Sequence, residues 1–405
     1  MIALYLAPVY FLFDIWILVM YLRWLGITFK PLKSWYFRIP VILIYLFLVS
    51  SIGIAFVMPV GILQKILKYI GNIWIGVNAF CFQVLVPVAV IRWILFLRGK
   101  KKGKTFRSMR QAFRETIWYR VLGLVLSLTV ICCTVYGIYH GRDIKVKNFE
   151  VDIQKDAGDL DSLNVVMIGD IHFGYNVGVG HTRKMVDLIN AQNPDIILVA
   201  GDIFDNEYEA LDNPEKLIDI VKTLKAKYGV YSVYGNHDIQ EKILAGFTFD
   251  HKSEKAADER MDAFVEACGW KHLRDEVVLV DDSFYIVGRN DEERPGKGLK
   301  ERKSIQELMK QTDQEKPVII LDHEPRDLKE QAEAGGDLCV NGHVHGGQVF
   351  PGTLLMKLMW ENAWGYKQIG TMHSVVTSGA GIWGPPMRIG TDTEICQITV
   401  NFTGK

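Results

Sequence analysis

Long apolar stretches, interrupted by few charges, dominate the first part of the chain. Four of them are long enough to cross a bilayer as helices, since a spanning helix needs about 20 mainly apolar residues. They lie at about residues 2–22, 39–60, 70–97 and 121–139, with tryptophan and tyrosine near their ends. Aromatic side chains of these two types favour the membrane interface. The pattern therefore predicts a transmembrane region of four helices over residues 1–140.

After this region the pattern changes to short apolar runs that alternate with amphipathic segments, which is typical of an α/β domain. We expect a linker and entry strand at 141–163 and the domain itself at 164–405. Strands are expected at 164–168, 195–200, 230–234, 277–280, 284–287, 317–321, 338–340, 374–377 and 394–400. Helices are expected at 182–191, 214–227, 258–268, 303–311 and 325–334. The mixed-charge segment 240–255 is predicted to be a surface loop or lid.

Charge in the short connections predicts the orientation of the membrane region. The loop between the second and third spans carries only Lys65 and Lys68, whereas the loops before and after it are richer in basic residues. These are Arg23, Lys30, Lys33 and Arg38 in the first loop, and Arg98, Lys100, Lys101, Lys102, Lys104, Arg107, Arg110 and Arg114 in the third. Basic loops stay in the cytoplasm, so we expect a multi-pass cell-membrane protein whose α/β domain after residue 140 is extracytoplasmic. The alternative, a nucleic-acid patch in the third loop, is disfavoured, and no nucleic-acid partner is expected.

Three polar side chains interrupt the predicted spans. Asp14 lies in the first, and Asn78 and Gln83 lie in the third. Such residues either mark a transport pathway or form interhelical hydrogen bonds. With so few of them we favour hydrogen bonds, so the helices are predicted to be an anchor in the lipid bilayer rather than a transporter.

The overall composition gives little further information about function. The chain has 46 basic and 46 acidic residues, so net charge indicates no partner. Its six cysteines show no paired spacing, and we expect no disulfide network.

Metal-binding side chains follow the predicted strands, where each strand ends. They are Asp170, His172, Asp202, Asp205, Asn236, His237, His323, His343 and His345. In open α/β sheets, ligand sites form beyond the carboxyl ends of the strands. Each residue alone could belong to an ordinary turn or helix cap. Five strand ends that all carry such side chains together predict one metal site at which they converge.

In order along residues 165–347, these blocks resemble the signature of calcineurin-like metallophosphoesterases. The blocks read Asp-x-His, Gly-Asp-x-x-Asp, Gly-Asn-His-Asp, a lone His and Gly-His-x-His. The later segment 378–388 is similar to that of the bacterial membrane-anchored branch, which includes proteins like UDP-diacylglucosamine hydrolases. The resemblance implies a four-layer α/β sandwich of mixed sheets flanked by helices. It also implies two divalent metal ions, either Mn, Fe or Zn.

The resemblance also assigns roles to the site residues. One ion would be held by Asp170, His172 and His345, the other by Asn236, His323 and His343, with Asp202 bridging both. His237 would protonate the leaving group or stabilise the transition state, and Asp205 would orient His237. In the phosphoprotein-phosphatase branch an arginine follows the second aspartate, but here Asn206 stands there. Arg289, Arg326 and Arg388 are candidate replacements, and no substrate-binding residue is assigned.

The function expected from the sequence is that of a membrane-anchored dinuclear-metal phosphoesterase. It would hydrolyse phosphomonoester, phosphodiester or pyrophosphate bonds by metal-activated hydroxide. Because of the expected orientation, the substrate would be lipid-linked or part of the cell envelope. The alternative is a non-catalytic membrane sensor or transporter that carries a phosphoesterase-fold domain. A full set of expected ligand positions favours the enzyme.

Overall fold

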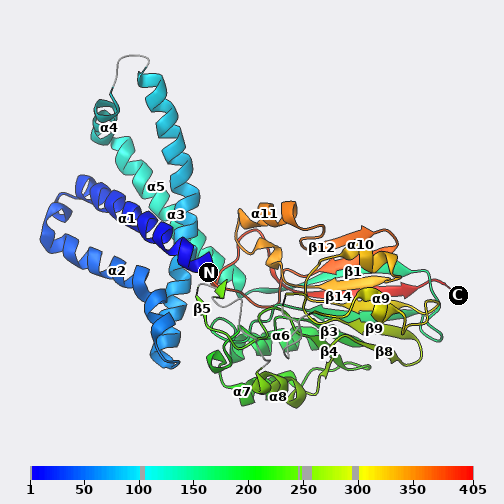
Figure 1. Ribbon diagram of the computed structural model, residues 1–405. Coiled ribbons are helices and arrows are strands. Elements are labelled where there is room, and N and C mark those ends of the chain that lie inside the picture. The colour runs from blue at the N-terminus through cyan, green and yellow to red at the C-terminus, as the bar shows by residue number, and fades with distance from the viewer. Residues whose placement is uncertain (1, 101–104, 245–246, 249–257, 294–300, 405) are drawn as a thin grey trace. The chain divides into compact units, whose positions relative to one another are not determined.

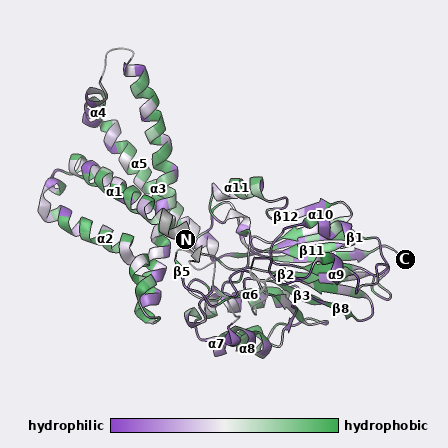
Figure 2. Ribbon diagram, viewed as in Figure 1, coloured by the Kyte–Doolittle hydropathy of each residue, from purple (hydrophilic) through white to green (hydrophobic). Residues whose placement is uncertain are grey.

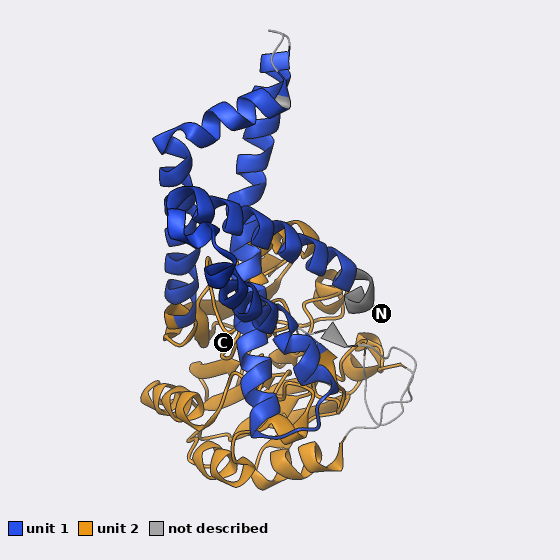
Figure 3. Cartoon of the chain, turned by 90° about the vertical axis from the view of Figure 1, so that its left-hand side faces the viewer, with its two compact units in different colours: residues 1–138, 244–249 blue, residues 139–243, 250–405 orange. Residues whose placement is uncertain are grey.

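The computed structural model describes two compact units. It covers residues 2–100, 105–244, 247–248, 258–293 and 301–404. The first unit comprises residues 1–138 and 244–249, and the second comprises residues 139–243 and 250–405 (Figure 3). We call the first the membrane unit and the second the catalytic unit.

The membrane unit contains five α-helices and one short 3-10 helix among its described residues. They are α1 (Ile2–Thr28), η1 (Lys30–Lys33), α2 (Trp35–Val57), α3 (Ile62–Lys100), α4 (Phe106–Glu115) and α5 (Ile117–Gly141) (Figure 1). All but η1 and α4 are long and apolar enough to span a bilayer, which confirms the four predicted spans. A helix satisfies its own backbone hydrogen bonds, as the hydrocarbon core requires.

Two boundaries in this unit differ from the sequence prediction. The helix α3 begins at Ile62, so Lys65 and Lys68 lie in a helix and not in a loop. The third connection contains the helix α4, whose first turn is capped by the Thr105 side chain, which accepts a hydrogen bond from Ser108 N. We had treated this basic connection only as a topological signal, because its charges obscured the helical period.

Asp14 joins three helices of the membrane unit. Its carboxylate accepts hydrogen bonds from Tyr45 of α2 at 2.8 Å, and from Trp74 and Asn78 of α3 at 3.2 Å and 3.1 Å. The side chain of Asp14 is buried. The predicted interhelical role of Asp14 and Asn78 is therefore confirmed.

Replacing Asp14 by alanine should loosen this bundle. Interhelical hydrogen bonds in membranes contribute about 0.6 kcal/mol each on average, so losing three should cost about 2 kcal/mol of unfolding free energy. Unfolding in mixed micelles with increasing dodecyl sulfate measures this. Val9→Ala on the exposed side of the same helix is the control. An equal effect of the two substitutions would contradict the bracing role of Asp14.

The catalytic unit contains two six-stranded sheets. The first has the order β1 (Ile144–Ile153), β14 (Thr393–Phe402), β2 (Ser162–Ile168), β3 (Ile196–Ala200), β4 (Val230–Val233), β7 (Lys271–His272). The second has the order β12 (Gly365–Ile369), β13 (Met372–Val376), β11 (Leu338–Asn341), β10 (Val318–Leu321), β9 (Phe284–Gly288), β8 (Glu276–Val280). A further two-stranded sheet pairs β5 (Ile243–Leu244) with β6 (Phe247–Thr248).

Helices cover the outer faces of both large sheets. The helices of this unit are α6 (Val179–Ala191), α7 (Pro214–Val221), α8 (Glu259–Ala267), α9 (Ile305–Met309), α10 (Leu328–Glu333) and α11 (Gly352–Met359), with the 3-10 turns η2 (Tyr208–Ala210) and η3 (His345–Gly347).

Alternating strand residues build separate apolar cores, because neighbouring side chains on a strand point to opposite faces. Val165 and Met167 of β2 share a core with Ile319 of β10, which places the two sheets face to face. Val166 of β2 packs instead in a core with α6, α7 and α8, and Ile320 of β10 packs in a core with α9 and α10. The expected four-layer sandwich of mixed sheets flanked by helices is confirmed.

Parallel pairing brings the functional strand ends to one edge of each sheet. The strands β2, β3 and β4 run parallel in the first sheet, and β9, β10, β11 and β13 do so in the second. Their carboxyl ends carry the candidate ligands, as the sequence predicted.

The entry strand expected within 141–163 is β1, ten residues long, which pairs parallel with β14 along its whole length. The strand β12 and the helix α11 were both missed. Of the predicted loop or lid at 240–255, residues 245–246 and 249–257 lie outside the described part of the chain.

Candidate metal centre

Tight turns after the strands direct the candidate ligands inward. Asp170 and His172 follow β2, and their backbone N–H groups donate to Gly201 O and Asp202 O of the turn after β3, both at 3.0 Å. Both residues have positive φ, at 52° and 51°. Asp202, His343 and His345 also have positive φ. Non-glycine residues rarely adopt this conformation, and where several do so together they indicate a functional site.

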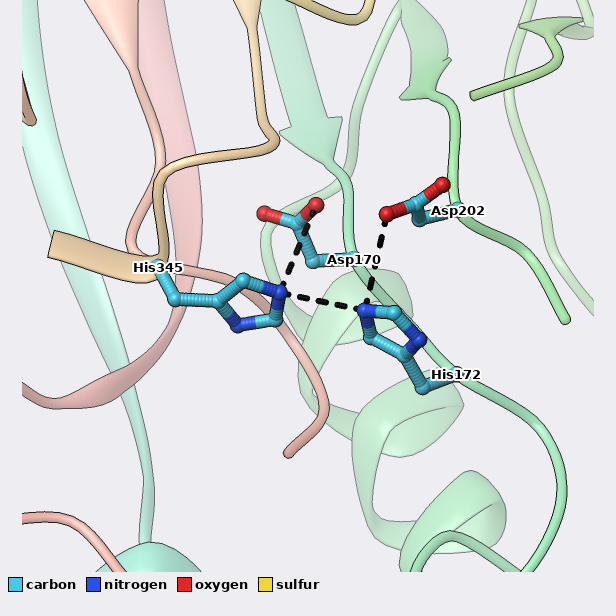
Figure 4. A group of neighbouring side chains, drawn as sticks. All are labelled: Asp170, His172, Asp202 and His345. Atoms are coloured by element: carbon cyan, nitrogen blue, oxygen red, sulfur yellow. Dashed lines mark hydrogen bonds and ion pairs between the residues drawn. The ribbon is translucent and has the colours of Figure 1, made fainter. Parts of the chain in front are cut away.

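Asp170, His172, Asp202 and His345 form the first cluster, and all four are buried (Figure 4). The Nε2 atoms of His172 and His345 lie 3.0 Å apart. His345 Nε2 is 3.8 Å from Asp170 Oδ1, and His172 Nε2 is 3.7 Å from Asp202 Oδ2. Ligand atoms on four side chains all lie within 4.8 Å of one another, close enough to contact one ion.

Asn236, His323 and His343 form a second cluster beside it. Asn236 Oδ1 is 2.9 Å from His343 Nδ1 and 3.2 Å from His323 Nε2. His323 Nε2 is also 3.2 Å from Asp202 Oδ2, the same oxygen that faces His172. One oxygen of Asp202 therefore borders both clusters, the position that a bridging ligand requires.

The polar atoms of the first cluster fit a cation better than they fit one another. Two imidazole nitrogens 3.0 Å apart share at most one proton, and Asp170 Oδ2 is buried with no hydrogen-bond partner. Buried polar atoms without partners are rare unless an ion or water satisfies them. Mixed imidazole and carboxylate donors suit several divalent transition metals. The expected ligand residues thus fit divalent ions, without selecting one metal.

The ring of one histidine is held by a hydrogen bond to the backbone, and two others have a carboxylate nearby but beyond hydrogen-bond distance. His323 Nδ1 donates to Ala200 O at 2.8 Å, which leaves Nε2 as the acceptor facing the cluster. His172 Nδ1 lies 3.6 Å from Asp205, and His343 Nε2 lies 3.9 Å from Glu324. Metal-binding histidines commonly present their second nitrogen to a carboxylate or carbonyl in this way.

The electrostatics of three ligands favour the protonation states that bind metals, whereas nearby carboxylates outweigh burial and raise the pKa values of His172 and His323. Burial, and then the neighbouring His323, lowers the pKa of His343 to about 3, so its ring is neutral. Burial and the adjacent His172 hold the pKa of His345 well below its ordinary value. Burial raises the pKa of Asp202, but nearby histidines such as His323 outweigh it and keep this pKa well below the usual range. Neutral imidazoles and an ionised carboxylate are the ligand forms.

His237 lies next to the first cluster, but its orienting contact differs from the expectation. Its ring centroid is 5.1 Å from that of His172, and its backbone N–H donates to Asp202 Oδ1 at 2.8 Å. His237 Nδ1 makes a short contact with Asn206 Oδ1, whereas we had expected Asp205 to orient it. Asp205 lies within the same group of side chains but faces His172 Nδ1. Asn206 has a left-handed backbone (φ 59°), which turns its amide toward His237.

Two residues have a supporting role that the sequence analysis did not assign to them. The carboxylate of Asp238 accepts hydrogen bonds from Phe204 N at 2.8 Å and Gly235 N at 2.7 Å, which joins the turns after β3 and β4. The fully buried Arg388 donates to His345 O at 3.2 Å and Gly381 O at 2.9 Å. Asp238 was visible as the last residue of its motif. Nothing in the sequence separated Arg388 from a surface charge.

The three arginines considered as phosphate clamps differ in their partners and in their exposure. Arg388 is engaged with backbone carbonyls, and Arg289 is buried and paired with Asp322 at 3.1 Å. Arg326 is partly exposed and pairs with Glu324 and Glu293. Among the three, Arg326 alone is accessible to a substrate.

Buried carboxylates and imidazoles at parallel strand ends of a four-layer sandwich define a metal-binding hydrolase domain. Residues 163–347 match the family model described as calcineurin-like phosphoesterase. The chain thus contains a calcineurin-like metallophosphoesterase domain, preceded by membrane-spanning helices.

Relatives named as metallophosphoesterases are similar to this chain. A transmembrane protein with metallophosphoesterase domain from Danio rerio is 28% identical over 81% of this chain and 74% of its own length. An uncharacterized metallophosphoesterase from Campylobacter jejuni is 26% identical, covering 84% of each chain. Another from Bacillus subtilis is 26% identical over 60% of this chain and 81% of its own. The structure of a purple acid phosphatase from yellow lupin seeds is similar only at a TM-score of 0.29, with 13% identity over 56% of this chain and 44% of that one.

Metal content should follow the two clusters. We expect about two divalent ions per chain, as in two-metal sites generally, and Asp202→Ala should remove most of both. His345→Ala should remove about one, because it belongs to the first cluster only. Elemental analysis of purified protein measures this. His373→Ala is the control, since His373 contacts Asp152 O away from the site. Unchanged metal in Asp202→Ala would contradict a shared ligand.

Proposed function

We propose that the chain is a membrane-anchored phosphoesterase that uses two divalent ions to hydrolyse phosphomonoester, phosphodiester or pyrophosphate bonds. The observation that supports this most is the shared oxygen of Asp202 between a buried cluster of ligands and a partly buried one. When bound there, the ions would neutralise the charge of a phosphate and activate a water nucleophile.

The chain's own residues then have separate tasks. Asp202 would fix the spacing of the two halves, since one carboxylate oxygen faces His172 and His323. The amide of Asn206 accepts the Nδ1 proton of His237 and so leaves Nε2 as the reactive nitrogen. A protonated His237 would donate from Nε2 to the leaving-group oxygen, a general-acid step. Asp205 would act on His172 rather than on His237.

The substrate is proposed to belong to the membrane or cell envelope. The basic first and third connections favour a cytoplasmic location for those loops and hence an extracytoplasmic catalytic unit. This makes cytoplasmic nucleotides and phosphoproteins poor candidates. A lipid-linked phosphate or pyrophosphate fits both the metal chemistry and the anchor. A specific version is hydrolysis of a glycolipid pyrophosphate, as in the UDP-diacylglucosamine hydrolase-like branch.

Catalysis should depend on Asp202 and His237. With Mn²⁺, the purified chain should cleave bis-p-nitrophenyl phosphate, and Asp202→Asn should lose nearly all of this rate. His237→Ala should lower kcat about 10²–10⁴-fold, the usual contribution of a general acid, while its metal content is unchanged. His373→Ala, which alters a histidine outside the clusters, should keep wild-type kinetics.

Equal rates for the wild type and Asp202→Asn would remove the catalytic proposal. That result would leave the non-catalytic sensor or transporter as the better explanation.

Topology can be tested independently of activity. A reporter that is active only outside the cytoplasm, fused after Lys405, should be active in cells. The same reporter inserted in the basic connection between α3 and α4 should be inactive. The opposite pattern would place the catalytic unit in the cytoplasm and return cytoplasmic-leaflet substrates to consideration.

A further inference from the structure

The helix α11 exposes a continuous apolar surface on the catalytic unit. Leu354, Leu355, Leu358 and Met359 are 55%, 54%, 85% and 65% exposed. Among the described residues of this unit, the other exposed large apolar side chains are Tyr139 at the end of α5, Leu279, Phe350 and Tyr366, and Phe350 adjoins α11. The helix is coloured as hydrophobic in Figure 2. Soluble surfaces rarely gather such side chains unless they bind something.

The arrangement of α11 matches a helix lying in a membrane interface. Residues three or four positions apart share one side of a helix, as Leu354 and Leu358, Leu355 and Leu358, and Leu355 and Met359 do, so the four exposed side chains form one broad stripe. Lys357 points elsewhere, with its Nζ 4.6 Å above the ring of Trp364. Lysine and tryptophan beside an apolar stripe are typical of helices that lie at the lipid headgroup level.

Both ends of α11 are attached to the metal centre. At its start the backbones of Gly347 and Gly352 touch, so that a Cβ on Gly352 would lie 2.6 Å from Gly347 O. Gly347 ends η3, the turn that begins with the ligand His345. At its end, the ring of Trp360 lies 5.3 Å from the ring of His343. The stripe is therefore close to ligands of both clusters, and so is any molecule that binds to it.

Chain connectivity keeps the catalytic unit near lipid. The last spanning helix, α5, continues to Gly141, whose carbonyl accepts a hydrogen bond from Thr393 of β14 at 2.7 Å. His140 of the same helix pairs with Asp392 at 3.1 Å. The chain therefore passes directly from a candidate spanning helix into the catalytic unit.

We propose that α11 inserts its apolar stripe into the bilayer interface and delivers lipid-borne phosphates to the metal centre. This rests on the proposed phosphoesterase function and narrows its substrate to phosphates carried by membrane lipids. The stripe sits among the acyl chains near the headgroups, Lys357 lies at headgroup level, and Trp360 separates the lipid from His343. A lipid phosphate then reaches the ions with its hydrocarbon still in the membrane.

Insertion can be measured without turnover. A spin label at Leu358→Cys is placed in full-length protein in nanodiscs, with the accessible Cys81, Cys132 and Cys133 replaced by alanine. Collisions with oxygen should exceed those with a water-soluble nickel chelate, as for a lipid-facing site. A label at Leu279→Cys, exposed on β8, should show the reverse. A water-accessible label at position 358 would overturn the proposal. So would strong spin–spin broadening between chains, which would indicate a second copy as the occupant.

Turnover then tests delivery. Leu354→Gln combined with Leu358→Gln should lower the rate on a phosphorylated lipid in vesicles by about tenfold, because interfacial binding scales with the buried apolar area. The rate on soluble bis-p-nitrophenyl phosphate should stay within about twofold, since neither residue touches the metal ligands. Leu279→Gln is the matched control and should change neither rate. Equal losses on both substrates would refute delivery by α11, whereas inactivity of the wild type on both would instead refute the proposed function.

Discussion

The burial of one carboxylate, that of Asp202, constrains the whole catalytic unit. Its Oδ1 accepts the backbone N–H of His237, and its Oδ2 faces His172 and His323. The ends of four strands, drawn from both sheets, therefore have to lie next to this carboxylate. A charge this deeply buried is tolerated only with compensating partners. The sheets, their register and the turns after them supply those partners, and a bound cation would complete them.

Much of the fold could be read from the sequence because its signals are local. Buried parallel strands appear as apolar runs, and the turn after each carries glycine with a polar side chain, so β2, β3, β4, β10 and β11 and their ligands were predictable. The four spans were predictable by length. The helix α11 was missed because its sequence has no clear polar face opposite the leucines. The same lack of polar residues makes this helix notable in the folded structure. The strand β1 lies within the entry segment that the sequence predicted.

Other features could not be predicted because they depend on the direction of side chains after folding. Asp205 and Asn206 are neighbours in sequence, yet one faces His172 and the other His237. The distinction arises from the positive φ of Asn206, which no sequence period reveals. Likewise, Arg388 looks like any charged residue until the turn after η3 and the segment around Gly381 fold around it. Sequence identified which residues gather, and the structure identified which of them touch.

The junction at Gly141 has a kinetic consequence. The helix α5 continues to Gly141, whose carbonyl accepts a hydrogen bond from Thr393 of β14. If the proposed substrate is carried by membrane lipids, attachment to an anchor in the same membrane would raise its effective concentration around the site. Substrates confined to the bilayer would be encountered by two-dimensional diffusion, whereas soluble phosphates would gain nothing from the tether. Shortage of substrate in the surrounding leaflet, rather than in the bulk solution, would then limit the flux through such an enzyme.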